Sequence, residues 1–180
     1  MGDGEVPTQP PCIVLGLGIN GLGIVRSLGR RGIVCHGLSS NQTEVGWKSR
    51  YCKPIESPSL KEDTSKFHIF FLNFLRLFSQ HPVVFPTDDL TVEYLKKHQE
   101  DICKFATLSF TANDAVDILL DKWAFYSFVS KYVDINTPES VVPSGDLNLL
   151  DESLFPCVCK PKKSFWDKST KINKVVYFAD

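Results

Sequence analysis

Residues 12–40 have the sequence CIVLGLGINGLGIVRSLGRRGIVCHGLSS, and this stretch decides the fold. Its first seven residues form an apolar run that ends in glycines, which is typical of a strand buried on both faces. Apolar residues then recur at helical spacing from Leu22 to Leu28, with Asn20 as the expected helix cap and Gly32 beyond the helix end. A second apolar run closes the stretch. The order strand, glycine turn, helix, strand predicts a right-handed βαβ unit.

The same alternation continues along the next seventy residues. One helix face is indicated by the spacing of four phenylalanines, Phe67, Phe71, Phe74 and Phe78. Short apolar runs at 82–86 and 105–110 predict further strands, and Asp88 or its neighbour is expected to cap the helix between them. The polar stretch 41–64 predicts mostly loop. These elements together predict an open parallel α/β sheet with helices on its faces.

The chain is expected to divide into three parts. Residues 1–11 contain three prolines and no apolar periodicity, and we expect them to be a disordered tail. Residues 12–112 form the predicted Rossmann-like sheet domain. Residues 113–180 begin with a helical stretch, 113–133, and end with apolar runs that include FPCVCKP at 155–161. This last part is predicted to be a small α+β unit.

Composition narrows the class of protein. The chain has 180 residues, of which 43% are hydrophobic and 23% are charged, so it can bury a core and is not disordered over most of its length. Twenty basic residues against 21 acidic ones give a net charge of -1, which argues against a generally basic nucleic-acid binder. No apolar run is long enough to span a bilayer, so a membrane is not an expected partner. Because of the balanced charge, nucleic acid is not an expected partner either.

The six cysteines and four histidines predict no metal site. The cysteines contain no C-x-x-C spacing, and several lie inside apolar runs, where a free thiol behaves as a small hydrophobic side chain. We therefore expect reduced structural thiols rather than a disulfide framework or a zinc site. The N-terminal residues lack the apolar segment of a secretory signal. A cytoplasmic protein with no metal bound by its cysteines or histidines is the expectation.

Gly16, Gly18 and Gly21 form a G-x-G-x-x-G pattern between a predicted strand and a predicted helix. Such a turn lets backbone N–H groups approach an anion at the helix N-terminus. A dinucleotide site also requires an acidic residue about 20 positions later, but residues 36–40 contain none and the first acid is Glu44, in the loop. NAD is therefore disfavoured. The glycines could also serve helix–strand packing alone.

An NADP site remains an alternative at this point. Its extra phosphate would need polar or basic partners after the second strand, and Ser39, Ser40, Lys48 and Arg50 lie there.

The C-terminal part carries a second set of candidate residues. Asp121-Lys122 opens a predicted helix, and Lys160 follows an apolar strand and precedes a proline. A lysine at the end of a buried strand is costly unless its ammonium meets an anion or carbonyl groups. The next loop suits a phosphate chain, or equally a solvated surface, because it carries five lysines and one aspartate (Lys162, Lys163, Lys168, Lys171, Lys174 and Asp167).

In this order, the motifs resemble the ATP-grasp superfamily. The resemblance rests on the glycine turn VLGLGINGLG at 14–23, the pair Asp121-Lys122, the stretch TPESVVP at 137–143 and FPCVCKP at 155–161. It implies a Rossmann-like domain followed by the first ATP-grasp lobe, with ATP and Mg²⁺ as cofactors. It also implies ATP contacts from Lys122, Lys160 and Lys171, and substrate contacts from Gly18, Asn20, Gly21, Thr87 and Asp88, the last two in the segment PTDD.

The resemblance implies the activity of an ATP-dependent carboxylate–amine ligase that acts on small molecules through an acyl phosphate. In that superfamily the Mg²⁺ ligands and most catalytic groups belong to a second lobe, which would follow Asp180, so we assign no catalytic residue. We expect this chain to be inactive alone. The loop from Lys162 to Asn173 also lacks the glycines that many members carry. An NADP-dependent oxidoreductase domain and a non-catalytic interaction fragment are the alternatives.

Overall fold

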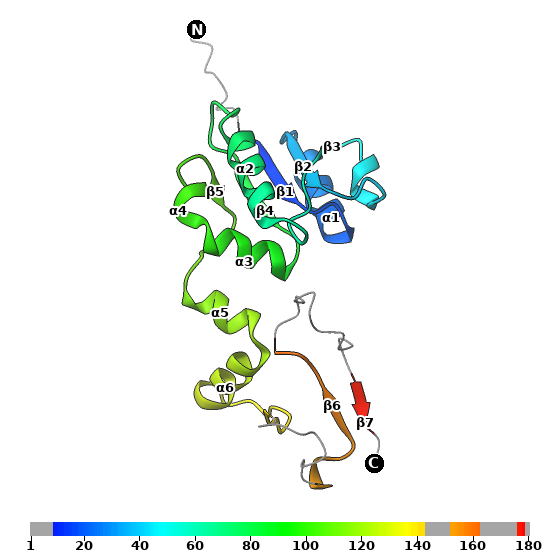
Figure 1. The fold of residues 1–180 in the computed structure, drawn as a ribbon, viewed down its shortest axis with the longest axis vertical. Helices are drawn as coiled ribbons and strands as arrows, with labels where there is room; N and C mark the ends of the chain where they lie inside the picture. The colour runs from blue at the N-terminus through cyan, green and yellow to red at the C-terminus, as the bar shows by residue number, and fades with distance from the viewer. Residues whose placement is uncertain (1–8, 143–151, 163–175, 179–180) are drawn as a thin grey trace. The chain divides into compact units, whose positions relative to one another are not determined.

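A computed structural model describes residues 9–142, 152–162 and 176–178 (Figure 1). The chain divides into two compact units, Met1–Ala112 and Asn113–Asp180, which we call unit 1 and unit 2. Among the described residues, no helix has the length and apolar character needed to cross a membrane.

Unit 1 is built on a five-stranded parallel sheet, which confirms the predicted fold class. The strand order is β3-β2-β1-β4-β5, so the first strand is central. All four residues of this strand are buried, as the apolar run predicted. The strands are β1 (Cys12–Leu15), β2 (Cys35–Ser39), β3 (Cys52–Glu56), β4 (Val83–Pro86) and β5 (Thr107–Leu108).

Helices cover both faces of the sheet. Because side chains alternate along a strand, Ile13 and Leu15 of β1 pack with Phe71 on one face, while Val14 packs with Val25 on the other. The first face carries most of the core, including the phenylalanine stripe that the sequence predicted. The helices are α1 (Ile19–Gly29), α2 (Thr64–Leu75), α3 (Asp89–Lys97) and α4 (Gln99–Ile102), with a 3₁₀ turn η1 (Val45–Lys48) between β2 and β3.

Residues 41–64 are mostly loop, as predicted, but two elements within them were missed. This stretch contains η1 and the edge strand β3, which pairs in parallel with β2. An edge strand needs no continuous apolar run, and it tolerates proline, since one side of its backbone makes no ladder bonds. Lys53 and Pro54 of β3 are exposed, which explains why apolar periodicity missed the strand.

A row of thiols crosses the sheet. Cys12 on β1 is in register with Cys35 on β2, which is in register with Cys52 on β3. All six cysteines of the chain are free. Burial raises the pKa of the Cys12 and Cys35 thiols, and it raises the pKa of Cys52 to about 11. These thiols therefore behave as apolar core groups, as the sequence predicted.

The described residues of unit 2 form two helices, a 3₁₀ turn and a two-stranded sheet. The predicted helical stretch 113–133 is two helices, because Asp121 has an extended backbone (φ −109°, ψ 113°) between them. Strand β6 pairs antiparallel with β7. The elements are α5 (Asp114–Leu120), α6 (Lys122–Tyr132), a 3₁₀ turn η3 (Glu152–Leu154), β6 (Cys157–Cys159) and β7 (Val176–Phe178).

Candidate functional site

The three glycines of the turn after β1 have different surroundings. Gly16 has a positive φ of 92°, and a Cβ there would lie 2.5 Å from the Thr87 hydroxyl oxygen. A Cβ on Gly21 would collide with the carbonyl oxygen of Gly16. Gly18 has no atom within 4 Å of such a Cβ. Gly21 thus lets α1 pack on the turn, and Gly16 lets the turn lie against Thr87. Gly18 leaves open space where a ligand can approach.

The expectation that Asn20 caps α1 was wrong. Gly18 is the N-cap, with an extended backbone and no side-chain cap, so Asn20 lies within the first helical turn. Its side chain is then free to reach the neighbouring strand, and Asn20 Nδ2 donates to the Thr87 carbonyl oxygen at 3.0 Å. This bond ties the start of α1 to the end of β4.

Thr87 and Asp88 follow β4 and are held by several hydrogen bonds. The Thr87 hydroxyl donates to the carbonyl oxygen of Leu15, at the end of β1, over 2.7 Å. Asp88 caps α3 as predicted, since its Oδ1 accepts from the Thr91 backbone N–H at 2.8 Å in a capping box. These bonds order the junction between β4 and α3 without any ligand.

Glu44 also lies at this site, although no motif in the sequence pointed to it. Its Oε2 accepts from the Leu17 backbone N–H at 2.6 Å, inside the glycine turn. The Gly46 N–H donates to the Leu17 carbonyl oxygen at 2.8 Å, so the segment around η1 is bonded to both backbone groups of Leu17. The sequence contained one signal for Glu44, since it is the first acidic residue after β2. It was interpreted as a loop residue because it lies several positions beyond the end of that strand.

A cavity of about 410 Å³ lies at these residues, and we call it the switch-point cavity. It stands beyond the carboxyl ends of β1 and β4, where the strand order reverses and where ligands of open α/β sheets bind. Gly21, a predicted substrate residue, does not line it. The lining residues are Gly16, Gly18, Ile19, Asn20, Glu44, Thr87 and Asp88.

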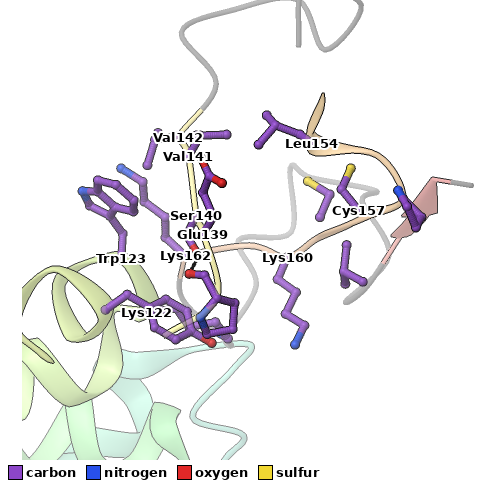
Figure 2. A pocket seen from close by; sticks show the side chains of 15 residues that line it. Lys122, Trp123, Glu139, Ser140, Val141, Val142, Leu154, Cys157, Lys160 and Lys162 are labelled. Atoms are coloured by element: carbon purple, nitrogen blue, oxygen red, sulfur yellow. Dashed lines mark hydrogen bonds between the residues drawn. The ribbon is translucent and has the colours of Figure 1, made fainter. Parts of the chain in front are cut away.

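Unit 2 has a cavity of about 470 Å³ of its own, which we call the lysine cavity (Figure 2). It brings together Lys122, at the start of α6, with Lys160 and Lys162, just after β6. The Lys122 backbone N–H donates to the Lys162 carbonyl oxygen at 2.8 Å, which joins the helix start to the segment after the strand. Most of the other lining residues are apolar or aromatic, among them Trp123, and Glu139 and Ser140 are polar.

The positions of Lys122 and Lys160 follow from a helix cap and from the alternation of side chains along β6. Asp121 Oδ1 accepts from the Ala124 N–H at 3.0 Å, so it caps α6 and fixes where Lys122 begins the helix. Along β6, Cys157 and Cys159 are half-buried, while Val158 and then Lys160 are exposed. Lys160 therefore emerges on the open face of the strand, as its alternation in the sequence predicted.

Other expected contacts cannot be placed. Lys171 and most of the predicted phosphate-covering loop lie outside the described residues. Within the part of the chain that the structure describes, no group of three or more His, Cys, Asp or Glu side chains is arranged to hold a metal ion.

No family model and no curated protein matches this sequence. Solved structures do match. N5-carboxyaminoimidazole ribonucleotide synthetase from Thermotoga maritima is similar with a TM-score of 0.60 at 16% identity, over 96% of this chain and 41% of that one. An N5-carboxyaminoimidazole ribonucleotide synthetase solved as an ADP complex gives a TM-score of 0.62 at 12% identity, over 96% of this chain and 42% of that one.

The chain thus spans about two fifths of the length of either synthetase. At these identities the likeness concerns the fold. The chain shares the fold of these synthetases, with the parallel α/β sheet that the sequence predicted.

Proposed function

We propose that this chain forms part of an ATP-dependent carboxylate–amine ligase. The fold it shares with two synthetases, one of them solved with ADP, supports this proposal. The observation that carries it is the lysine cavity, because Lys122 and Lys160, distant in sequence, line one hollow together with Lys162. Ammonium groups around an apolar cavity suit a nucleotide, whose base is flat and apolar and whose phosphates are anionic.

The reaction that fits this arrangement has two steps. A carboxylate oxygen of the substrate attacks the γ-phosphorus of ATP, which gives an acyl phosphate and releases ADP. An amine then attacks the acyl carbon, an amide bond forms and inorganic phosphate leaves. The lysines position the phosphates and neutralise the charge that develops during phosphoryl transfer.

The two cavities are proposed to have different roles. Lys122 and Lys160, with Lys171 in the same role, bind the nucleotide, and the switch-point cavity binds a small-molecule substrate through Gly18, Asn20, Thr87 and Asp88. The ATP-grasp resemblance implies Mg²⁺ as well, but no step is assigned to it, because no group of described side chains fits a metal ion. Six free thiols support a reducing compartment, and we place the protein in the cytoplasm.

The geometry of Glu44 argues against the dinucleotide alternative. Its carboxylate is bonded to the Leu17 N–H in the glycine turn, where the pyrophosphate of NADP would have to approach. Two anions at one turn repel each other. The other alternative is an interaction fragment that binds no nucleotide. The titration described next distinguishes it from the ligase proposal.

The test is a nucleotide titration of the full chain. We expect ATP to bind and Lys160→Ala to weaken its affinity about tenfold or more, since charge-assisted contacts to phosphate contribute on that scale. Lys131→Ala is the matched control, because Lys131 lies on α6 and does not line the lysine cavity. Unchanged ATP affinity in the Lys160 variant, or thermal protection by NADPH and not by ATP, would overturn the proposal.

A further inference from the structure

Three arginines and a tyrosine lie at the edge of the sheet opposite the switch-point cavity. Arg30 caps the C-terminus of α1, Arg26 is in the last turn of that helix, and Arg50 and Tyr51 directly precede β3. Because the strands of unit 1 are parallel, the end of α1 and the start of β3 lie at the amino edge of the sheet, whereas the switch-point cavity lies at the carboxyl edge. We call these four residues the arginine cluster.

The ring of Tyr51 packs directly against the end of α1. A Cβ on Gly29 would lie 2.6 Å from the Tyr51 Cβ, so this close packing requires a glycine, and the next residue along the chain is Arg30. The Arg50 guanidinium lies over the ring, with its Cζ 4.7 Å from the ring centroid. Arg50 Nη2 donates to the Tyr51 hydroxyl oxygen at 2.6 Å.

Two arginines act on this one hydroxyl. The hydrogen bond from Arg50 is the main cause that lowers the pKa of Tyr51, and the charge of Arg50, with a hydrogen bond and the charge of Arg30, lowers it further. Arg26 lies four residues before Arg30, on the same side of α1. All three arginines are exposed, so a ligand can reach them.

The described carboxylates leave this positive charge uncompensated. Residues 9–43 contain no Asp or Glu, and no described carboxylate forms an ion pair with Arg26, Arg30 or Arg50. The next acids, Glu44 and Glu56, are hydrogen-bonded to other groups. The negative end of the α1 dipole favours a cation at Arg30, but it does not account for Arg50, which comes from a separate segment and acts on the same hydroxyl.

The donors of the arginine cluster match a phosphate group. A guanidinium presents paired N–H donors to an oxyanion, and Tyr51 keeps its own O–H as a further donor. One guanidinium can serve the two oxygens of a carboxylate. A phosphate monoester has three terminal oxygens and about two negative charges near pH 7, so two guanidinium groups from separate segments suit it better.

We propose that the arginine cluster binds a phosphate dianion, separately from the switch-point cavity. Arg30 and Arg50 pair with the phosphate oxygens, the Tyr51 O–H donates a further hydrogen bond, and Arg26 adds positive charge from α1. The inference goes beyond the proposed function and does not rest on it.

The experiment is an NMR titration of the full chain at pH 7.5, observed at the arginine Nε–Hε groups. Ionic strength is held constant, because exposed charges are screened by salt. Inorganic phosphate is the probe, glycerol 3-phosphate is the monoester, and acetate is the matched carboxylate. We expect phosphate to shift the signals of Arg30 and Arg50 along a saturating curve, and acetate to leave them almost unchanged. Tighter binding of glycerol 3-phosphate assigns the site to a monoester, and the reverse order assigns it to free phosphate.

Single substitutions test which side chains hold the anion. Arg30→Ala and Arg50→Ala should each weaken phosphate binding about tenfold, because each removes charge-assisted hydrogen bonds. Arg50→Lys should weaken it as well, since an ammonium keeps the charge but lacks the paired donors. Arg76→Ala is the matched control, because Arg76 follows α2, where its guanidinium lies over the ring of Phe105, and it should leave binding unchanged.

Four results would overturn the inference. They are no saturating shift with phosphate, equal shifts with acetate, a shift of the Arg76 signal as large as those of Arg30 and Arg50, and unaltered phosphate binding in both alanine variants. The titration of the unaltered chain needs no variant, so misfolding of one variant leaves the test intact. None of these results affects the ligase proposal, which the Lys160→Ala titration tests.

Discussion

Single glycines in α1 have opposite roles, and a pair of substitutions separates them. Gly21→Ala should lower the free energy of unfolding by about 2–4 kcal/mol, because its methyl group would collide with the Gly16 carbonyl. Gly23→Ala should raise it by about 0.5–1 kcal/mol, since Gly23 is exposed in the same helix with nothing within 4 Å of its Cβ position. Urea unfolding of both variants measures the difference. Equal effects would contradict the packing role of Gly21.

His36 makes the stability of unit 1 depend on pH. Its ring lies edge-on to Phe74 and Phe78, with centroids 5.9 and 5.1 Å away, and its Nδ1 is buried with no hydrogen-bond partner. Burial, together with the charge of Lys53, lowers the pKa of His36 below the 6.5 of a free histidine. The unfolded chain therefore binds the extra proton first, and stability should fall as pH drops through 6.5.

The measurement is the free energy of unfolding between pH 7.5 and 5. His36→Leu should reduce the loss of stability at the acid end, whereas His81→Gln, a change at an exposed histidine, should leave the profile unaltered. Part of the slope should persist in the His36 variant, because burial and the neighbouring His68 also lower the pKa of His98. An identical profile in both variants would refute the role of His36.

At the scale of elements, the side chain of Asp121 caps the start of α6. Asp121→Ala removes the acceptor of the Ala124 N–H and should lower the stability of α6 by about 1 kcal/mol, while Asp121→Asn should preserve most of it. Hydrogen exchange at the Ala124 amide reports the local loss directly. Unchanged protection in the alanine variant would show that α6 begins without this cap.

The sequence predicted the elements whose pattern is strong and local. The run at β1, the phenylalanine stripe of α2 and the Asp88 cap of α3 each follow from a few adjacent residues. Strand β3 was missed, because an exposed edge strand has no apolar run to detect. Such a strand forms because it pairs with a neighbouring strand, and the periodicity of its own residues does not indicate that pairing.

The candidate site was predicted only in part for a similar reason. Gly18, Asn20, Thr87 and Asp88 were selected from motifs, and the structure brings all four to one cavity. Glu44 was not selected, since its place depends on how the 3₁₀ turn η1 folds back onto Leu17, 27 residues away in sequence. Long-range hydrogen bonds of this kind leave no periodic trace in the sequence.

At the scale of the whole molecule, the core is unevenly distributed. Among the described residues, the buried apolar side chains of unit 2 are Val116, Leu120 and Val129, and all others belong to unit 1. Because buried apolar area is the main stabilising term, unit 1 should be the more stable unit. Hydrogen exchange on the full chain should show protection in β1 and β4 that outlasts protection in α6.

Residues 1–112 expressed alone provide a second measurement of the same prediction. They contain the whole five-stranded sheet and should unfold cooperatively in urea. A gradual transition, or exchange in β1 as fast as in α6, would refute the assignment of stability to unit 1.

Thr87 joins three elements at the rim of the switch-point cavity through hydrogen bonds. Its hydroxyl bonds to the end of β1, its carbonyl accepts from α1, and its amide donates to the Thr91 hydroxyl of α3 at 3.2 Å. Three elements thus meet at one residue, and none of them moves away without breaking a bond to it. The rim residues lose their conformational entropy when the chain folds, before any small molecule binds. A small molecule that binds at this cavity would therefore meet a rim that is already ordered.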